Sequence, residues 1–268
     1  MMKIITLLNE KGGVGKTTTS IMLAAELARR GNRVCIIDGD SQGHATLALN
    51  QDRIDGLYDF VIGDVAINDV LKAVDPYLYN SDDYNLFIIP GGARTRNISP
   101  MISDKESNIS VLTLKHRIEK IAGSFNYIII DTSPSISNLH IAYYIASDYI
   151  IAPTECTYLP MEGLFASLDH LNQMREQLAN QNVPCAELLG IVPTKFYGRE
   201  IVQHENLGYL KGKYEGYVLP AIRRLSDWEK ASQIGELLYT FSPSSRALQD
   251  NRAFVNAVLE RIEEFADV

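Results

Sequence analysis

The stretch Glu10-Lys11-Gly12-Gly13-Val14-Gly15-Lys16-Thr17-Thr18 determines how the rest of the chain is interpreted. It follows an apolar run at residues 3–8 that predicts a buried strand, and it precedes residues 20–28, whose apolar side chains recur at helical spacing. Glycines allow backbone N–H groups to curve around an anion, and a helix N-terminus adds a partial positive charge. Strand, glycine-rich turn and helix in this order therefore predict a phosphate-binding loop.

Two positions in this loop have an expected chemical role. Lys16 would reach the terminal phosphates of a nucleotide, and the Thr17 hydroxyl would be a ligand of Mg²⁺. The usual pattern has Gly six residues before the lysine, where this chain has Glu10, and a second lysine, Lys11, precedes the glycines. A glycine turn with incidental lysines is the alternative, which the flanking strand and helix disfavour. The residues expected to bind nucleotide here are Lys11, Gly12, Gly13, Val14, Gly15, Lys16, Thr17 and Thr18.

The composition is that of an ordinary globular protein, with 46% hydrophobic and 22% charged residues, and the length fits one domain spanning residues 1–268. The net charge of −8 and a sequence pI of about 5.2 provide no overall attraction to DNA or anionic lipid, so such binding would need a local patch. Cys35, Cys156 and Cys185 lie far apart without metal-ligand spacing, which is typical of a reducing cytosol. No signal peptide or membrane span is expected.

Apolar runs and helical periodicity alternate along the whole chain. Further strands are expected at residues 33–38, 87–89, 125–131, 149–154, 188–193 and 216–220. Helices are expected at residues 56–62, 67–74, 111–121, 142–146, 164–178 and 247–265. This alternation predicts an α/β fold with a single doubly wound, mostly parallel sheet flanked by helices.

Two of these strands end in aspartates. The strand at 33–38 runs into Asp38-Gly39-Asp40, and the strand at 125–131 ends in Asp131. Ligands of open parallel sheets bind beyond the carboxyl ends of the strands, so we expect these carboxylates beside the phosphate loop. An aspartate that closes an apolar strand after such a loop is typical of a Walker B residue that holds Mg²⁺ through water.

The string Lys-Gly-Gly-Val-Gly-Lys-Thr-Thr at residues 11–18 resembles the deviant phosphate loop of the ParA/MinD family of ATPases, which have a P-loop NTPase fold. Residues 38–44 resemble the second motif of that family, commonly Asp-x-Asp-Pro-Gln-Gly-Asn. The resemblance implies that Asp40 orients or activates the attacking water and that Asp38 supports the Mg²⁺ shell. The chain departs from the motif at Ser41 and His44, which loosens the loop because proline would have fixed φ.

The resemblance also implies how the protein would use ATP and Mg²⁺. In the family the second lysine, here Lys11, reaches across a face-to-face homodimer to the nucleotide of the partner. ATP would therefore drive dimerisation, with Lys11, Lys16 and Asp40 as catalytic residues. Hydrolysis would be weak alone and stimulated by a ParB-like or adaptor protein. Thr194 and Pro220 match the segments that flank the adenine base in the family.

The branches of this family differ in the surface that they bind. MinD-like members bind membranes through a basic amphipathic C-terminal helix, whereas residues 259–268 carry four acids and one base, which argues against a membrane partner. ParA-like members bind DNA non-specifically through basic residues near the carboxyl end. Residues 195–230 hold seven bases and five acids, so the alternative is a solvated mixed surface. The candidate DNA-binding residues are Lys195, Arg199, Arg223 and Arg224.

The sequence therefore predicts a partition ATPase of the cytoplasm that associates with the nucleoid when ATP is bound. Its cargo would be a plasmid, a chromosome or a protein assembly. A MinD-like ATPase that positions another cargo and a small-molecule P-loop kinase are the alternatives. A reductase similar to the nitrogenase iron protein would need paired cysteines at the dimer axis, which the scattered cysteines do not supply.

Overall fold

A computed structural model of the chain describes residues 2–104, 106–135 and 137–266. Seven strands in these ranges form one sheet with the order β3-β4-β2-β5-β1-β6-β7. Neighbouring strands run parallel, except that β3 at the edge is antiparallel to β4. The predicted doubly wound, mostly parallel sheet is confirmed. The strands are β1 (Lys3–Leu7), β2 (Val34–Gly39), β3 (Lys72–Ala73), β4 (Leu86–Ile89), β5 (Tyr127–Thr132), β6 (Tyr149–Glu155) and β7 (Glu187–Thr194).

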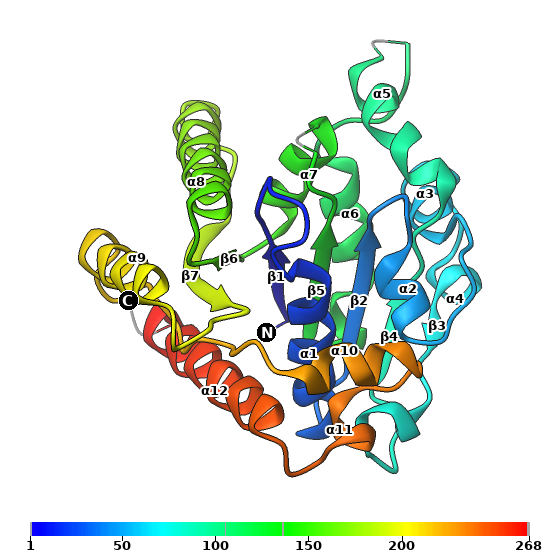
Figure 1. Ribbon diagram of the computed structural model, residues 1–268. Coiled ribbons are helices and arrows are strands. Elements are labelled where there is room, and N and C mark those ends of the chain that lie inside the picture. Colours follow the sequence, from blue (N-terminus) through cyan, green and yellow to red (C-terminus); the bar gives the residue numbers. More distant parts are fainter. Residues whose placement is uncertain (1, 105, 136, 267–268) are drawn as a thin grey trace.

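Helices cover both faces of this sheet (Figure 1). One core lies between the sheet and the first and last helices, and the other lies below the helices that connect β2, β4, β5 and β6. The helices are α1 (Lys16–Arg29), α2 (His44–Ala48), α3 (Gly56–Val61), α4 (Ile67–Val70), α5 (Ile98–Ser103), α6 (Thr113–Glu119), α7 (Asn138–Ala146), α8 (Tyr158–Ala179), α9 (Ile201–Lys213), α10 (Ser226–Gln233), α11 (Leu238–Phe241) and α12 (Arg246–Ala266).

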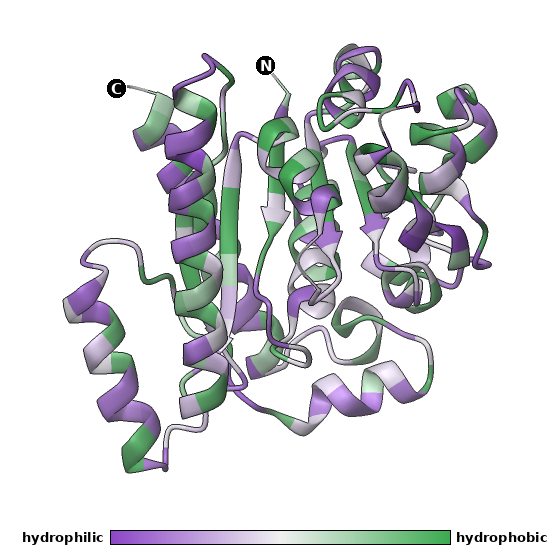
Figure 2. Cartoon of the chain, turned by 90° about the horizontal axis from the view of Figure 1, so that it is seen from above, coloured by the Kyte–Doolittle hydropathy of each residue, from purple (hydrophilic) through white to green (hydrophobic). Residues whose placement is uncertain are grey.

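Alternation along the central strand explains its apolar sequence. Ile129 of β5 faces the core below α1 and α12, whereas Ile128 and Ile130 face the core below α3, α6 and α7. Successive side chains of a strand point to opposite faces, so a strand covered on both faces must be apolar at nearly every position. Figure 2 shows this arrangement as mainly green strands between helices that alternate green and purple.

Two of the predicted elements are wrong. Residues 216–220 do not form a strand: they make an isolated bridge through Val218 and Ile191, and the sheet ends at β7. Pro220 has no N–H to extend this pairing. The helix predicted at 67–74 stops at Val70, because the backbone turns extended at Leu71 and β3 then pairs with β4.

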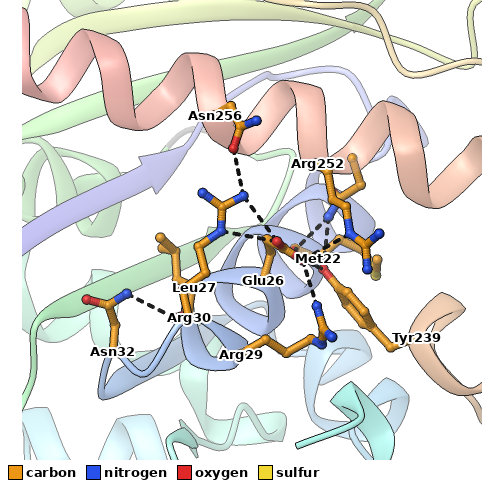
Figure 3. A network of polar contacts seen from close by, with 10 residues as sticks. Met22, Glu26, Leu27, Arg29, Arg30, Asn32, Tyr239, Arg252 and Asn256 are labelled. Atoms are coloured by element: carbon orange, nitrogen blue, oxygen red, sulfur yellow. Dashed lines mark hydrogen bonds and ion pairs between the residues drawn. The ribbon is translucent and has the colours of Figure 1, made fainter. Parts of the chain in front are cut away.

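The helix that follows the phosphate loop is fixed at its far end by a buried carboxylate (Figure 3). Glu26 of α1 is only 4% exposed and accepts hydrogen bonds from the Tyr239 hydroxyl at 2.9 Å and from the Arg30 guanidinium at 3.1 Å. Arg29 at 3.5 Å and Arg252 at 3.9 Å complete the group of cations around it. This network connects α1 to α11 and α12, and therefore holds the helix whose other end faces the site.

Candidate nucleotide site

The loop between β1 and α1 presents unpaired backbone N–H groups. Gly13 and Gly15 have left-handed backbones with φ of 80° and 88°, a conformation that favours glycine. Gly15 is the N-cap of α1, and no side chain caps this helix end. The N–H groups of its first turn therefore remain available to an anion, and the helix dipole favours a negative charge there.

Hydrogen bonds to three other elements hold the loop in this shape. The Asn9 amide donates to the Pro153 carbonyl of β6 at 2.8 Å, and the Thr194 hydroxyl of β7 donates to the Val14 carbonyl at 2.7 Å. The backbone N–H of Glu10 donates to the Ser167 hydroxyl of α8 at 2.8 Å. The loop is thus already shaped by these contacts, so little ordering is needed when a ligand binds.

The two lysines of the loop lie in different environments. Lys16 is 7% exposed, and its ammonium donates to the carbonyls of Asn9 at 2.7 Å and Lys11 at 3.1 Å. Burial lowers the pKa of Lys16, and the nearby Asp131 and Asp40 oppose this effect. A buried ammonium that has only carbonyl partners is strongly stabilised when an anionic phosphate binds beside it. The Lys11 side chain, by contrast, is exposed.

Asp131 at the end of β5 contacts the first turns of α1. Its two carboxylate oxygens accept hydrogen bonds from the Thr17 hydroxyl at 2.8 Å and from the Ser20 hydroxyl at 3.0 Å. Burial raises the pKa of Asp131 to about 7, with a further contribution from Asp38, its partner in register on β2. The two hydroxyls and Lys16 oppose this rise. Holding this carboxylate in a buried position beside the phosphate loop therefore costs free energy.

Asp38 and Asp40 have different surroundings although both lie at the end of β2. Asp38 is fully buried and accepts from the N–H and hydroxyl of Thr46 at 2.8 and 2.7 Å, and from the N–H of Asp40 at 3.2 Å. Burial is the main reason that its pKa is raised. Asp40 is partly exposed, lines the cleft and accepts from the N–H of Gln42 at 2.9 Å. Asp38 thus holds the segment in place, and Asp40 is available to a ligand.

This oxygen donor set fits Mg²⁺. Mg²⁺ prefers hard oxygen ligands and is commonly held by one or two carboxylates together with substrate phosphates. Thr17 and Asp131 supply such oxygens beside the loop, and a cation would favour the ionised form of the buried Asp131. In the part of the chain that the structure describes, no cluster of three or more His, Cys, Asp or Glu residues forms a metal site of its own.

Two adjoining clefts open above the loop. The larger, of about 1130 Å³, is lined by most of the predicted loop residues and by Asp40. The smaller, of about 540 Å³, is lined by Gly15, Thr18, Thr194 and Lys195 and by residues 222–225. Pro220 is exposed and lines neither cleft. Two residues later, the N–H of Ile222 donates to the Pro193 carbonyl at 2.8 Å, and Ile222 lines the smaller cleft.

The four candidate DNA-binding residues do not form one free basic surface. The Lys195 ammonium donates to the Gly13 carbonyl at 2.6 Å and pairs with Glu155 at 2.9 Å. The Arg223 guanidinium forms a two-pronged ion pair with Asp250 at 2.6 and 2.8 Å. The remaining candidates, Arg199 and Arg224, are exposed.

The sequence reasoning missed two residues of α7 near the site, His140 and Tyr143. Nε2 of His140 lies 3.2 Å from the Ser133 carbonyl, and burial lowers the pKa of this histidine to about 4. His140 is therefore neutral near pH 7 and ties α7 to the loop after β5. Polar rings in an otherwise apolar helix are the signal that could have indicated them.

The chain is similar in sequence to one protein family and to several named proteins. A family model described as an AAA domain matches residues 2–184. The sporulation initiation inhibitor protein Soj of Bacillus subtilis is 33% identical over 253 residues, which cover 93% of this chain and 95% of Soj. The chromosome partitioning protein ParA of Myxococcus xanthus is 28% identical over 97% of this chain and 88% of its own length.

Solved structures share the fold. An ATP complex of McdA from Cyanothece has a TM-score of 0.81 at 21% identity and covers 98% of this chain and 96% of its own. A cobyrinic acid a,c-diamide synthase from Mycobacterium smegmatis with ADP and magnesium has a TM-score of 0.78 at 25% identity and covers the same shares. A putative plasmid partition protein from Borrelia burgdorferi bound to AMPPNP has a TM-score of 0.72 at 25% identity, and the match covers 98% of each chain.

Proposed function

The chain belongs to the ParA-type partition ATPases, and we propose that it hydrolyses ATP, dimerises when ATP is bound and then binds DNA without sequence preference. Residues 1–268 would act as a single ATPase domain with a phosphate loop of the deviant type. A ParB-like or adaptor protein would stimulate hydrolysis and release. The protein would then act on the nucleoid of the cytoplasm, with a plasmid, a chromosome or a protein assembly as cargo.

The observation that carries this proposal is the contact between Asp131 and Thr17 at the start of α1. It places a buried carboxylate of β5 against the hydroxyl expected to hold Mg²⁺, directly beside Lys16. A metal ion bound there would neutralise charge that develops on the terminal phosphate. A lone buried carboxylate is costly in an apolar core, so the position of Asp131 against Thr17 is best explained by a bound cation.

Different residues of the site would have different roles in hydrolysis. The N–H groups of the loop and the first turn of α1 would bind the phosphates, with Lys16 reaching the terminal one. Thr17 and Asp131 would hold the metal with support from Asp38, which also fixes the segment that carries Asp40. Asp40 has a partly exposed carboxylate in the cleft, which suits a residue that orients the attacking water.

Dimerisation is assigned to Lys11. The loop that carries Lys11 is anchored to the fold, but the Lys11 side chain is exposed, so its amine is free to reach a second protomer. A lysine at an interface is costly unless it meets an anion, and the phosphates of the partner's nucleotide would supply one. DNA binding is assigned first to Arg199 and Arg224, since Lys195 and Arg223 are engaged within the protein.

The test measures oligomeric state, DNA binding and turnover in one preparation. With Mg²⁺–ATP we expect dimers by light scattering, DNA binding that weakens steeply with salt, and slow release of phosphate. Lys11→Ala should bind ATP and remain monomeric, and Asp40→Ala should dimerise without turnover. A wild-type protein that stays monomeric with ATP and leaves DNA unshifted at low salt would refute the proposal. Normal hydrolysis by Asp40→Ala would move the water-orienting role elsewhere.

The alternatives predict other outcomes. A small-molecule ATP-dependent enzyme is favoured by the size of the larger cleft, which extends beyond the loop to Arg96 and Ser99. Such an enzyme would turn over ATP at the same rate with and without DNA. A MinD-like membrane role is disfavoured because α12 packs its apolar side chains, Phe254, Val255, Val258 and Ile262, into the core. No helix among the described residues is long and apolar enough to cross a bilayer.

A further inference from the structure

The hydroxyl of Tyr143 is buried without a partner directly below the site. Tyr143 lies on α7, its side chain is fully buried, and its oxygen has no hydrogen-bond partner among the described residues. A buried hydroxyl left unpaired costs about 1–3 kcal/mol. Phenylalanine would fill the same space without this cost, so the hydroxyl calls for an explanation.

Gly39 provides the space that this hydroxyl occupies. A Cβ atom added to Gly39 would clash with the Tyr143 hydroxyl oxygen and would lie 2.7 Å from the Asp131 carbonyl oxygen. Gly39 is part of β2 and does not have a positive φ, so its backbone does not require glycine. Glycine is needed at this position because both the Tyr143 hydroxyl and the Asp131 backbone carbonyl lie where a Cβ atom would be.

This contact falls at the segment that carries the water-orienting carboxylate. Gly39 stands between Asp38, which is fixed by Thr46, and Asp40, which faces the cleft. Gly39 itself lines the floor of the larger cleft, and the hydroxyl lies against it from the core side. Burial and the three nearby aspartates raise the pKa of Tyr143 well above its usual value, so the hydroxyl keeps its proton and can donate.

We propose that Tyr143 is a positioning residue for Asp40. When Mg²⁺ and nucleotide fill the cleft, its hydroxyl donates a hydrogen bond to the Gly39–Asp40 segment, directly or through one buried water, and so fixes the direction of the Asp40 carboxylate. The inference rests on the proposed ATPase function. It adds that the filled site strengthens a hydrogen bond for which the described residues supply no direct partner.

The test compares Tyr143→Phe with Tyr144→Phe. Tyr144 is the adjacent, equally buried tyrosine of α7, and its hydroxyl is already 3.3 Å from Nδ1 of His170. Without nucleotide, Tyr143→Phe should melt no lower than wild type, whereas Tyr144→Phe should melt lower. With Mg²⁺ and a non-hydrolysable ATP analogue, Tyr143→Phe should bind about 2- to 10-fold more weakly, the range that one hydrogen bond provides. Tyr144→Phe should bind the analogue like wild type.

Turnover and a second substitution complete the experiment. Tyr143→Phe should lower kcat by about tenfold and raise KM for ATP in step with its weaker binding of the analogue, because KM approaches Kd when chemistry is slow. Tyr144→Phe should leave both kcat and KM unchanged. Gly39→Ala should cost less stability in the Tyr143→Phe background than alone, because the closest clashing atom has been removed. A Tyr143→Phe protein that binds the analogue and hydrolyses ATP like wild type overturns this inference. A wild-type protein that binds no ATP instead overturns the proposed function.

Discussion

Replacing Glu26 by Gln should destabilise the protein without disturbing nucleotide binding. Glu26 is almost fully buried and accepts hydrogen bonds from Tyr239 and Arg30, with Arg29 and Arg252 close by. Glutamine keeps the shape of the side chain but removes the charge. The network in Figure 3 would then change from charge-assisted to neutral hydrogen bonds.

The magnitude follows from those contacts. Each of the two short hydrogen bonds should lose about 1 kcal/mol when its acceptor becomes neutral, because bonds to charged groups are about twice as strong. The ion pairs add little, since the arginine side chains are 24% to 42% exposed and water screens them. The net loss is about 2 kcal/mol. For a chain of 268 residues this lowers Tm by about 4 °C.

The assay is urea and thermal unfolding of Glu26→Gln beside Glu176→Gln, which changes an exposed glutamate of α8. We expect a loss below 0.5 kcal/mol for the control. Affinity for Mg²⁺–ATP should change by less than threefold, because Glu26 lies ten residues, or about 15 Å, along α1 from Lys16. If the two variants unfold at the same urea concentration, the network does not stabilise the attachment of α1.

Three further predictions concern the site and its surroundings. The pKa of Asp131 is raised to about 7, so the free energy of unfolding of the nucleotide-free protein should fall as pH rises from about 4 to about 7 and this carboxyl group loses its proton. Affinity for Mg²⁺–nucleotide should rise over the same range, by up to tenfold per pH unit below 7, and then level off, because the metal binds the ionised carboxylate. Calorimetry in two buffers should detect the released proton, and an affinity that does not change with pH would contradict this. Gly163→Ala should weaken ATP-dependent dimerisation in sedimentation and lower stability by about 1–3 kcal/mol, because the new Cβ would lie 2.9 Å from the Cβ of Lys11 and 3.1 Å from Oδ1 of Asn9 and would displace the start of the loop. Dimerisation equal to wild type would show that Lys11 tolerates this shift. Arg224→Ala should weaken DNA binding and reduce the salt slope by about 1, whereas Arg223→Ala should mainly lower stability by about 1 kcal/mol; equal losses of DNA affinity would contradict this division.

The elements nearest the phosphate loop could be predicted because their signals are local. The loop, the strand before it and the helix after it depend on glycine spacing and on side-chain periodicity within 30 residues. Asp131 could be placed next to Thr17 although 114 residues separate them, because the carboxyl ends of parallel strands share one edge of the sheet. The topology of a parallel sheet thus predicts this contact without any local signal in the sequence.

Other features depend on contacts for which no such rule exists. The ion pair of Arg223 with Asp250 joins a loop to α12, and nothing in the sequence near Arg223 indicates it. The side-chain contact that requires glycine at position 39 comes from Tyr143, more than 100 residues away. The bridge at Val218 has strand-like composition, and Pro220, two residues later, has no N–H to extend it. Periodicity indicates burial, but it does not indicate which buried groups meet.

The charges of the site show why nucleotide binding should alter more than the loop. Burial lowers the pKa of Lys16 and raises the pKa of both Asp38 and Asp131, so each group is held in surroundings that disfavour its charged form. A phosphate beside Lys16 and a cation beside Asp131 would favour the charged forms of both groups at once. The free energy regained on binding is therefore coupled between β2, β5 and α1. Tyr143 lies where β2 meets β5, so pairing of its hydroxyl would be one more term that only the filled site can gain.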